Sequence, residues 1–102
     1  MYRLLFQGSH AHQPPVHVRE PVLTIGRADS CHVQLLANGV SDRHAAIEQR
    51  ADGFYLCDLA SATGVRVNES PIQQHRLRSG ETIEIGAVRL CFEVLHDLPD
   101  VP

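Results

Sequence analysis

The sequence predicts an all-β protein, a β-sandwich of about eleven short and mostly antiparallel strands. Apolar and polar residues alternate over short segments, and Gly, Pro, Asn or Asp separate each segment from the next. No window places apolar residues at helical spacing between capping residues, so almost no helix is expected. Many short strands at close spacing favour a sandwich.

The N-terminal part contains three predicted strands. Residues 2–6 are apolar and strand-forming, and a loop with a Pro-Pro pair follows over residues 8–15. Residues 16–19 alternate, and Glu20-Pro21 ends that strand. Residues 22–25 then resume the pattern with two apolar side chains on one face.

The middle of the chain continues in short strands. Residues 33–35 alternate, and residues 45–50 and 54–59 flank Asp52-Gly53. Asp-Gly between two apolar runs is a strong hairpin signal, because Gly accepts a positive φ. Another short strand is expected over residues 65–67.

The C-terminal part ends in the clearest pair of strands. A brief apolar segment at Pro71-Ile72 precedes it. Residues 82–85 alternate, and Gly86-Ala87 turns the chain. Residues 88–94 place every second, apolar side chain on one face, which is typical of a half-buried strand.

Length and charge restrict the functions that the chain can have. Its 102 residues fit one domain, which we expect over residues 1–95, followed by an acidic, proline-containing tail or linker over residues 96–102. The net charge is −3 and all nine basic residues are Arg. Because no basic stripe is present, nucleic acid is not an expected partner. No apolar run approaches the roughly 18 residues of a membrane span, and no signal peptide is expected.

The three cysteines indicate a reducing compartment. Their number is odd and they show no Cys-x-x-Cys spacing, so a disulfide framework is not expected. We therefore expect the protein in the cytoplasm. Cys57 and Cys91 lie inside apolar runs, where we expect buried thiols.

Two short motifs carry residues suited to binding an anion. Gly26-Arg27 and Ser41-x-x-His44 stand at the ends of neighbouring predicted strands. Arg supplies a fixed fork of donors for phosphate or carboxylate, and a serine hydroxyl adds one more donor. By themselves these residue types are also common in ordinary turns.

A longer series of linked motifs resembles the forkhead-associated (FHA) domain. After Gly26-Arg27 and Ser41-x-x-His44 come Asp58-Leu59-x-Ser61-x-x-Gly64-x-x-Val67-Asn68 and then Leu77-x-x-Gly80-Glu81-x-Ile83-x-Ile85-Gly86. The resemblance covers about residues 22–94, nearly the whole chain. It implies an FHA/SMAD-like sandwich whose recognition loops gather at one end.

The resemblance also implies roles for individual residues. Arg27 would bind the phosphate of a phosphothreonine, and Ser41 would contact the same phosphate. His44 would brace the recognition loops from behind. Structural support of the site would come from Gly26, His44, Gly64 and Asn68.

The chain departs from the family pattern beside the phosphate. The usual Ser-Arg-x-His is Ser-Asp-Arg-His here, so Asp42 puts a carboxylate where the family has a cation. Two unit charges about 4 Å apart at an effective dielectric near 20 interact by roughly 4 kcal/mol, so Asp42 opposes a phosphate unless it turns away or pairs with Arg43. Thr63 replaces an asparagine that holds the peptide backbone, and Val65 removes another hydroxyl. Asp42, Arg43 and Thr63 remain expected members of the phosphopeptide site.

We therefore predict a protein–protein interaction module that recognises a phosphothreonine-containing segment in signalling or assembly, with no cofactor. The segment would belong to a separate protein or to the same polypeptide. A second hypothesis stays open, a degenerate FHA domain that acts as a phosphate-independent scaffold, for example in a bacterial secretion apparatus. The sequence does not predict the oligomeric state.

Two further functions are disfavoured. Ser41, His44 and an acid could form a hydrolase site, but no Gly-x-Ser-x-Gly elbow is present, so no enzyme is expected. His10, His12 and His17 could chelate a metal if they lay on one face of a strand. Their segment predicts a loop with no nearby Cys or carboxylate, so no metal site is expected.

Overall fold

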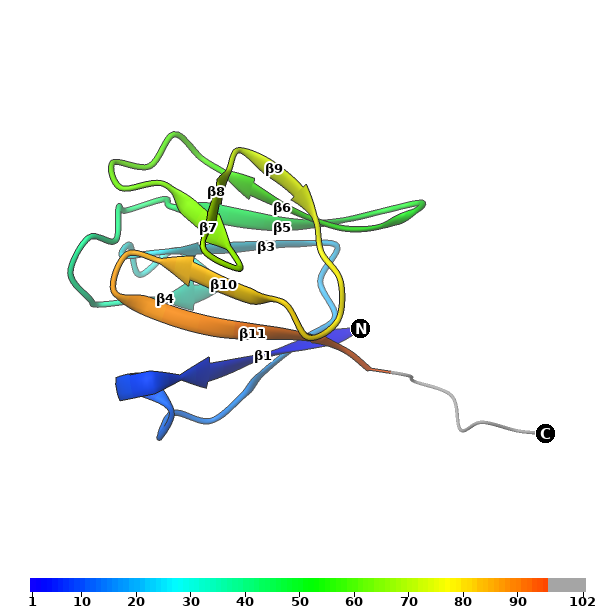
Figure 1. Ribbon diagram of the computed structural model, residues 1–102, viewed down its shortest axis with the longest axis horizontal. Helices are drawn as coiled ribbons and strands as arrows, with labels where there is room; N and C mark the ends of the chain where they lie inside the picture. The colour runs from blue at the N-terminus through cyan, green and yellow to red at the C-terminus, as the bar shows by residue number, and fades with distance from the viewer. Residues whose placement is uncertain (96–102) are drawn as a thin grey trace.

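The computed structural model describes residues 1–95 and forms a sandwich of two β-sheets (Figure 1). The first sheet has six strands, in the spatial order β2 (Val16–Val18), β1 (Tyr2–Gln7), β11 (Val88–Val94), β10 (Thr82–Ile85), β7 (Val65–Val67) and β8 (Ser70–Ile72). The second has five, in the order β4 (Val33–Gln34), β3 (Val22–Gly26), β5 (Ala45–Arg50), β6 (Gly53–Asp58) and β9 (Gln74–Arg76). The predicted all-β sandwich is thus confirmed, and the predicted tail over residues 96–102 lies outside the described residues.

The strands are mostly antiparallel, as predicted. The hairpin expected at Asp52-Gly53 joins β5 to β6, with Arg50 paired to Gly53. One pair is parallel, because β4 runs alongside β3 with Ile25 opposite Val33. No helix in the described part of the chain is long and apolar enough to span a membrane.

Alternate residues of both sheets form the core between them. Leu4, Ile25, Ile47, Leu56 and Leu90 are all fully buried there. Burying one such side chain contributes roughly 1.5–3 kcal/mol. A shift of one residue along a strand would turn its apolar side chains to solvent, so the core fixes the register of the strands.

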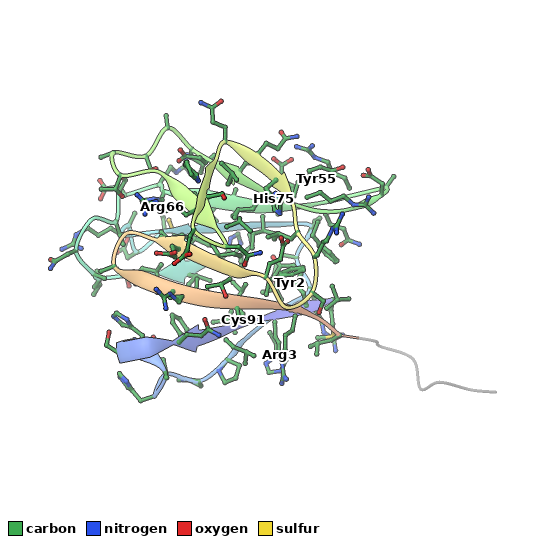
Figure 2. All side chains as sticks on the ribbon, viewed as in Figure 1. Tyr2, Arg3, Tyr55, Arg66, His75 and Cys91 are labelled. Atoms are coloured by element: carbon green, nitrogen blue, oxygen red, sulfur yellow. The ribbon has the colours of Figure 1, made fainter. Side chains whose placement is uncertain are left out.

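Three aromatic rings close the core near the N-terminus. Tyr2, Phe54 and Phe92 pack with ring centroids 4.9–5.7 Å apart, two of the three pairs edge-on. Figure 2 labels Tyr2 among the side chains of this region. These contacts join β1 and β11 of one sheet to β6 of the other, so the cluster ties the two sheets together.

A few local features differ from the prediction. Strand β9 was not expected, and the loop after β1 contains a turn of 3₁₀ helix, η1 (Gly8–His10). Cys57 and Cys91 are only half-buried, because they occupy the outward-facing positions of β6 and β11, whereas Cys31 is buried. The expectation of buried thiols at Cys57 and Cys91 was therefore wrong.

Four connections gather at one end of the sandwich, on the left of Figure 1. They are the β3–β4 loop, the β4–β5 loop, the β6–β7 loop and the β10–β11 turn. The N-terminus and the β5–β6 hairpin lie toward the other end. This arrangement brings together the segments in which the sequence places its candidate site.

Candidate functional site

The site begins where β3 ends at Gly26. A Cβ on this residue would lie 2.2 Å from the carbonyl oxygen of Asp42 and 3.0 Å from that of Ser41. Only glycine allows so close an approach. The backbone N–H of Arg27 donates to Ser41 O at 2.9 Å, and that of Ala28 donates to Asp42 O at 3.1 Å. Arg27 and Ser41 are thereby held side by side.

The Arg27 side chain is exposed, and one end of it is anchored. Its Nη1 donates to the Ala37 carbonyl at 3.0 Å, and its own backbone carbonyl accepts from Gln34 Nε2 at 3.2 Å. A guanidinium carries five N–H donors, so most of them remain available to an anion. Because the anchor restricts its rotation, Arg27 loses less conformational entropy when a ligand binds.

The Ser41 hydroxyl has its hydrogen free for a ligand. Its Oγ accepts from the backbone N–H of Ala62 at 3.0 Å. No protein group in residues 1–95 accepts the hydroxyl hydrogen, so Ser41 can donate it to an anion that approaches beside Arg27.

His44 is fully buried behind these loops. Its Nδ1 accepts from the backbone N–H of Ser41 at 3.0 Å, so the ring hydrogen lies on Nε2 and is donated to the Gly64 carbonyl at 2.7 Å. The imidazole therefore joins the β4–β5 loop to the β6–β7 loop. Both ring nitrogens are occupied by backbone groups, so His44 does not activate the Ser41 hydroxyl as a base.

Thr63 adds another link between the same two loops. Its hydroxyl donates to the Gly39 carbonyl at 2.6 Å. The hydrogen is thus already committed, and toward a ligand Thr63 can only accept a hydrogen bond.

The β6–β7 loop is shaped by its own side chains. Asp58 Oδ1 accepts from the backbone N–H of Ser61 at 3.0 Å and from its hydroxyl at 2.6 Å. The Ser61 Oγ accepts in turn from the N–H of Gly64, which has a φ of 82°. Asp58 and Ser61 were not predicted as supports of the site, although the Asp-x-x-Ser spacing is typical of side chain–backbone turns.

The Asp42 and Arg43 side chains are both exposed, and neither has a protein partner among residues 1–95. The pairing considered from the sequence therefore does not form. The Asp42 carbonyl, by contrast, is well held, since it also accepts from the buried Cys31 thiol at 3.2 Å. Cys31 is a support that the sequence did not reveal.

Asn68 lies outside this cluster. It and Glu69 have positive φ values of 49° and 72° in the two-residue turn between β7 and β8. The Asn68 Oδ1 accepts from the N–H of Thr82 at 3.0 Å, which connects the turn to the start of β10. The structure thus places Asn68 in the scaffold, away from the loops around Arg27.

A groove of about 340 Å³ opens beside the cluster. Gly39, Thr63 and Gly64 line it on the loop side, and Arg66 and Glu84 line it on the sheet side. Figure 2 labels Arg66 on β7, near the end where the loops gather.

The three histidines considered for a metal site lie in three different segments of the chain. His10 is in η1, His12 is exposed in the following loop and His17 is on β2. Within the described residues, no three His, Cys, Asp or Glu side chains are placed to hold a metal ion.

A β-sandwich that ties several loops together at one end has the form of a loop-based binding module. The comparison with known families agrees, since the model of the FHA domain matches residues 23–86. The chain belongs to the FHA family and is a protein-interaction module.

Sequence relatives and solved structures are consistent with this assignment. FhaA, an FHA domain-containing protein of Mycobacterium tuberculosis, is 36% identical over 69 residues, which are 68% of this chain and 13% of that protein. An oxoglutarate dehydrogenase inhibitor of Corynebacterium diphtheriae is 35% identical over 72 residues, or 71% of this chain and 50% of that protein. The chain therefore spans half or less of these relatives. A structure from a study of phosphothreonine-dependent FHA domain interactions has a TM-score of 0.83 and 29% identity, covering 95% of this chain and 98% of its own.

Proposed function

We propose that this domain recognises phosphothreonine in a protein partner, with Arg27 and Ser41 on the phosphate. The observation that carries the proposal is the pair of available donors, the guanidinium of Arg27 and the hydroxyl hydrogen of Ser41, fixed side by side by the Arg27 N–H bond to Ser41 O. The phosphothreonine dependence stated for the related FHA structure supports it.

The chemistry suits a phosphate dianion. A phosphorylated threonine carries about −1.5 to −2 charges and three acceptor oxygens, and Arg meets such oxygens with two parallel N–H bonds. Arg43 is exposed in the β4–β5 loop, which also carries Ser41, and adds a second cation near the site. Thr63, as an acceptor, would receive a backbone N–H of the bound segment.

The test is a calorimetric titration with a degenerate phosphothreonine peptide pool and with the same pool unphosphorylated. A hydrogen bond to a charged group contributes roughly 1.5–3 kcal/mol, so Arg27→Ala should weaken phosphopeptide binding by about tenfold to a hundredfold. Arg19→Ala is the matched control, because Arg19 is also exposed but lies in the β2–β3 connection. Phosphate-dependent binding that survives Arg27→Ala would show that the phosphate site is assigned wrongly.

A second candidate function is a phosphate-independent scaffold, and the exposed, unpaired carboxylate of Asp42 favours it. In that case neither pool binds, although the protein is folded. The variant Asp42→Asn distinguishes the two functions. If the site binds phosphate, removing the negative charge should strengthen phosphopeptide binding. If the domain is a phosphate-independent scaffold, the variant should still not bind the phosphopeptide.

We also propose that residues 1–95 fold as one unit, with residues 96–102 as a linker, and that the protein works in the cytoplasm. The cysteines of the described part, Cys31, Cys57 and Cys91, are all free thiols, which supports a reducing compartment. Removal of residues 96–102 should leave the melting temperature unchanged. A large loss of stability would assign these residues to the folded unit.

A further inference from the structure

The groove beside Thr63 is one of three hollows that adjoin on the outer face of the six-stranded sheet. Their volumes are about 340, 310 and 210 Å³. Glu84 of β10 lines all three, and Arg89 of β11 lines two of them. Glu84 is thus the common floor of a depression that leads away from the loop cluster.

Glu84 lies between two arginines and pairs with neither of them. The strand register places Arg66 of β7 and Arg89 of β11 directly opposite Glu84, on either side. In the described part of the chain, its carboxylate has no hydrogen bond or ion pair. On the same face, Arg3 and Glu93 are also directly opposite one another, and they do form an ion pair at 2.6 Å.

The degree of burial distinguishes these three charges. Arg66 and Arg89 are exposed and lie in water, which screens their repulsion of an incoming cation. Glu84 is half-buried, so its field is screened less. A carboxylate can only accept hydrogen bonds, and Lys and Arg are the side chains that supply charged donors.

The depression borders the β6–β7 loop, which also carries contacts of the proposed phosphate site. Thr63 and Gly64, which line the groove, belong to the loop that Ser41 and His44 hold in place. A segment bound at Arg27 and Ser41 that passes Thr63 therefore enters the groove whose floor is Glu84.

We propose that Glu84 is a specificity-determining residue that selects a basic side chain, Lys or Arg, in the partner segment near its phosphothreonine. This inference rests on the proposed function, since the phosphothreonine sets the position of the segment. It adds a requirement for the partner's sequence, a positive charge at one fixed distance from the phosphate.

The experiment is selection from a peptide library that has one fixed phosphothreonine and randomised flanking positions. The proteins compared are the wild type, Glu84→Gln, Glu84→Lys and Glu20→Lys. Glu20 is exposed and lies in the β2–β3 connection, away from the groove. Glu20→Lys therefore changes the net charge of the protein by the same amount as Glu84→Lys but at a distant position. Thermal melting verifies that each variant is folded, and Glu84→Gln keeps the side-chain shape if Glu84→Lys does not fold.

The wild type and Glu20→Lys should both enrich Lys and Arg about threefold to fivefold at one flanking position, the range expected for a partly exposed ion pair. Glu84→Gln should lose that enrichment, and Glu84→Lys should favour Asp and Glu at the same position. A wild-type selection without basic enrichment, or an enrichment that Glu84→Gln keeps, would overturn this inference while leaving phosphothreonine recognition intact. If no phosphopeptide is selected at all, both proposals fail.

Discussion

Replacing Gly26 by alanine would test the contact on which the candidate site depends. The new Cβ would lie 2.2 Å from the Asp42 carbonyl oxygen and 2.8 Å from the carbonyl carbon. Both atoms belong to the backbone, so rotation of a side chain cannot relieve the overlap. The Ser41–Asp42 segment must instead move away from β3 by about 1 Å.

Such a movement would break the hydrogen bonds that hold this segment. The carbonyls of Ser41 and Asp42 accept three bonds of 2.9–3.2 Å, and a displacement near 1 Å takes them beyond bonding range. Each of these hydrogen bonds contributes about 1 kcal/mol net. Their loss, together with the strain that remains, should lower the free energy of unfolding by roughly 2–4 kcal/mol. A domain of ordinary stability survives this, with a melting temperature lower by roughly 10–25 °C.

Urea unfolding measures the global effect, and amide hydrogen exchange locates it. We expect the amides of Arg27 and Ala28 to exchange much faster in the variant, because both donate to the displaced carbonyls. Phosphopeptide binding should fall at least about tenfold, since Arg27 and Ser41 lose their fixed geometry. Gly8→Ala is the control, because Gly8 has open space around it, so that the added Cβ meets no backbone; the variant reports only the cost of the positive φ of Gly8, which Gly26 does not share.

The reasoning would be refuted if Gly26→Ala unfolded within about 0.5 kcal/mol of the wild type and kept the slow exchange of the Arg27 amide. That result would mean that β3 and the β4–β5 loop tolerate a side chain between them. Gly8→Ala should lose about 1–2 kcal/mol from its left-handed backbone alone and leave binding unchanged.

Three further predictions concern other parts of the domain. His44→Ala should lower the free energy of unfolding by roughly 2–5 kcal/mol in a urea titration, because it removes a fully buried side chain and leaves two part-buried backbone groups without their partner. Tyr2→Phe should keep or raise the melting temperature, since the buried Tyr2 hydroxyl has no hydrogen-bond partner among residues 1–95; a drop of several degrees would show that this hydroxyl is satisfied. The hydrogen bond from Tyr55 lowers the pKa of Asp52, so Tyr55→Phe should raise that pKa in an NMR titration. An unchanged Asp52 titration would mean that the bond does not persist in solution.

The sign of the Asp52 effect on stability follows from the direction of its pKa shift. The folded-state pKa is lower than the unfolded one, so the stabilisation is present above the unfolded pKa and is lost as the pH falls through the folded pKa. Because the carboxylate lies on an exposed hairpin, the effect should be small and weaken with salt.

Much of the fold could be predicted because local pattern and tertiary burial agree. Strand β11 alternates strictly, and Val88, Leu90 and Phe92 are buried in the core as this pattern predicts. Val94, at the end of the strand, is exposed, because the facing sheet no longer covers it there. The β5–β6 hairpin follows from Asp52-Gly53. Strand β9 could not be predicted, since Gln74–Arg76 has no apolar alternation and becomes a strand only by pairing with β6 at the sheet edge.

The candidate site was predictable only in part. The family motifs identified Arg27, Ser41 and His44, and the structure places all three at one loop cluster. The commitment of the Thr63 hydroxyl could not be predicted, because its acceptor, the Gly39 carbonyl, lies far along the chain and meets it only in the folded protein. The support from Cys31 depends equally on a tertiary contact.

The departures from the family pattern do not weaken the site equally. Thr63 replaces an asparagine, but its hydroxyl joins two loops, so the shape of the site is kept while a donor to the ligand is lost. Asp42 is different, because its backbone carbonyl is held by two donors, the Ala28 N–H and the Cys31 thiol, while its carboxylate is exposed and unpaired. The scaffold therefore fixes the position of this segment regardless of the side chain it carries. Whether the site accepts a phosphate then depends on electrostatics, in which the cations of Arg27 and Arg43 oppose one negative charge from Asp42.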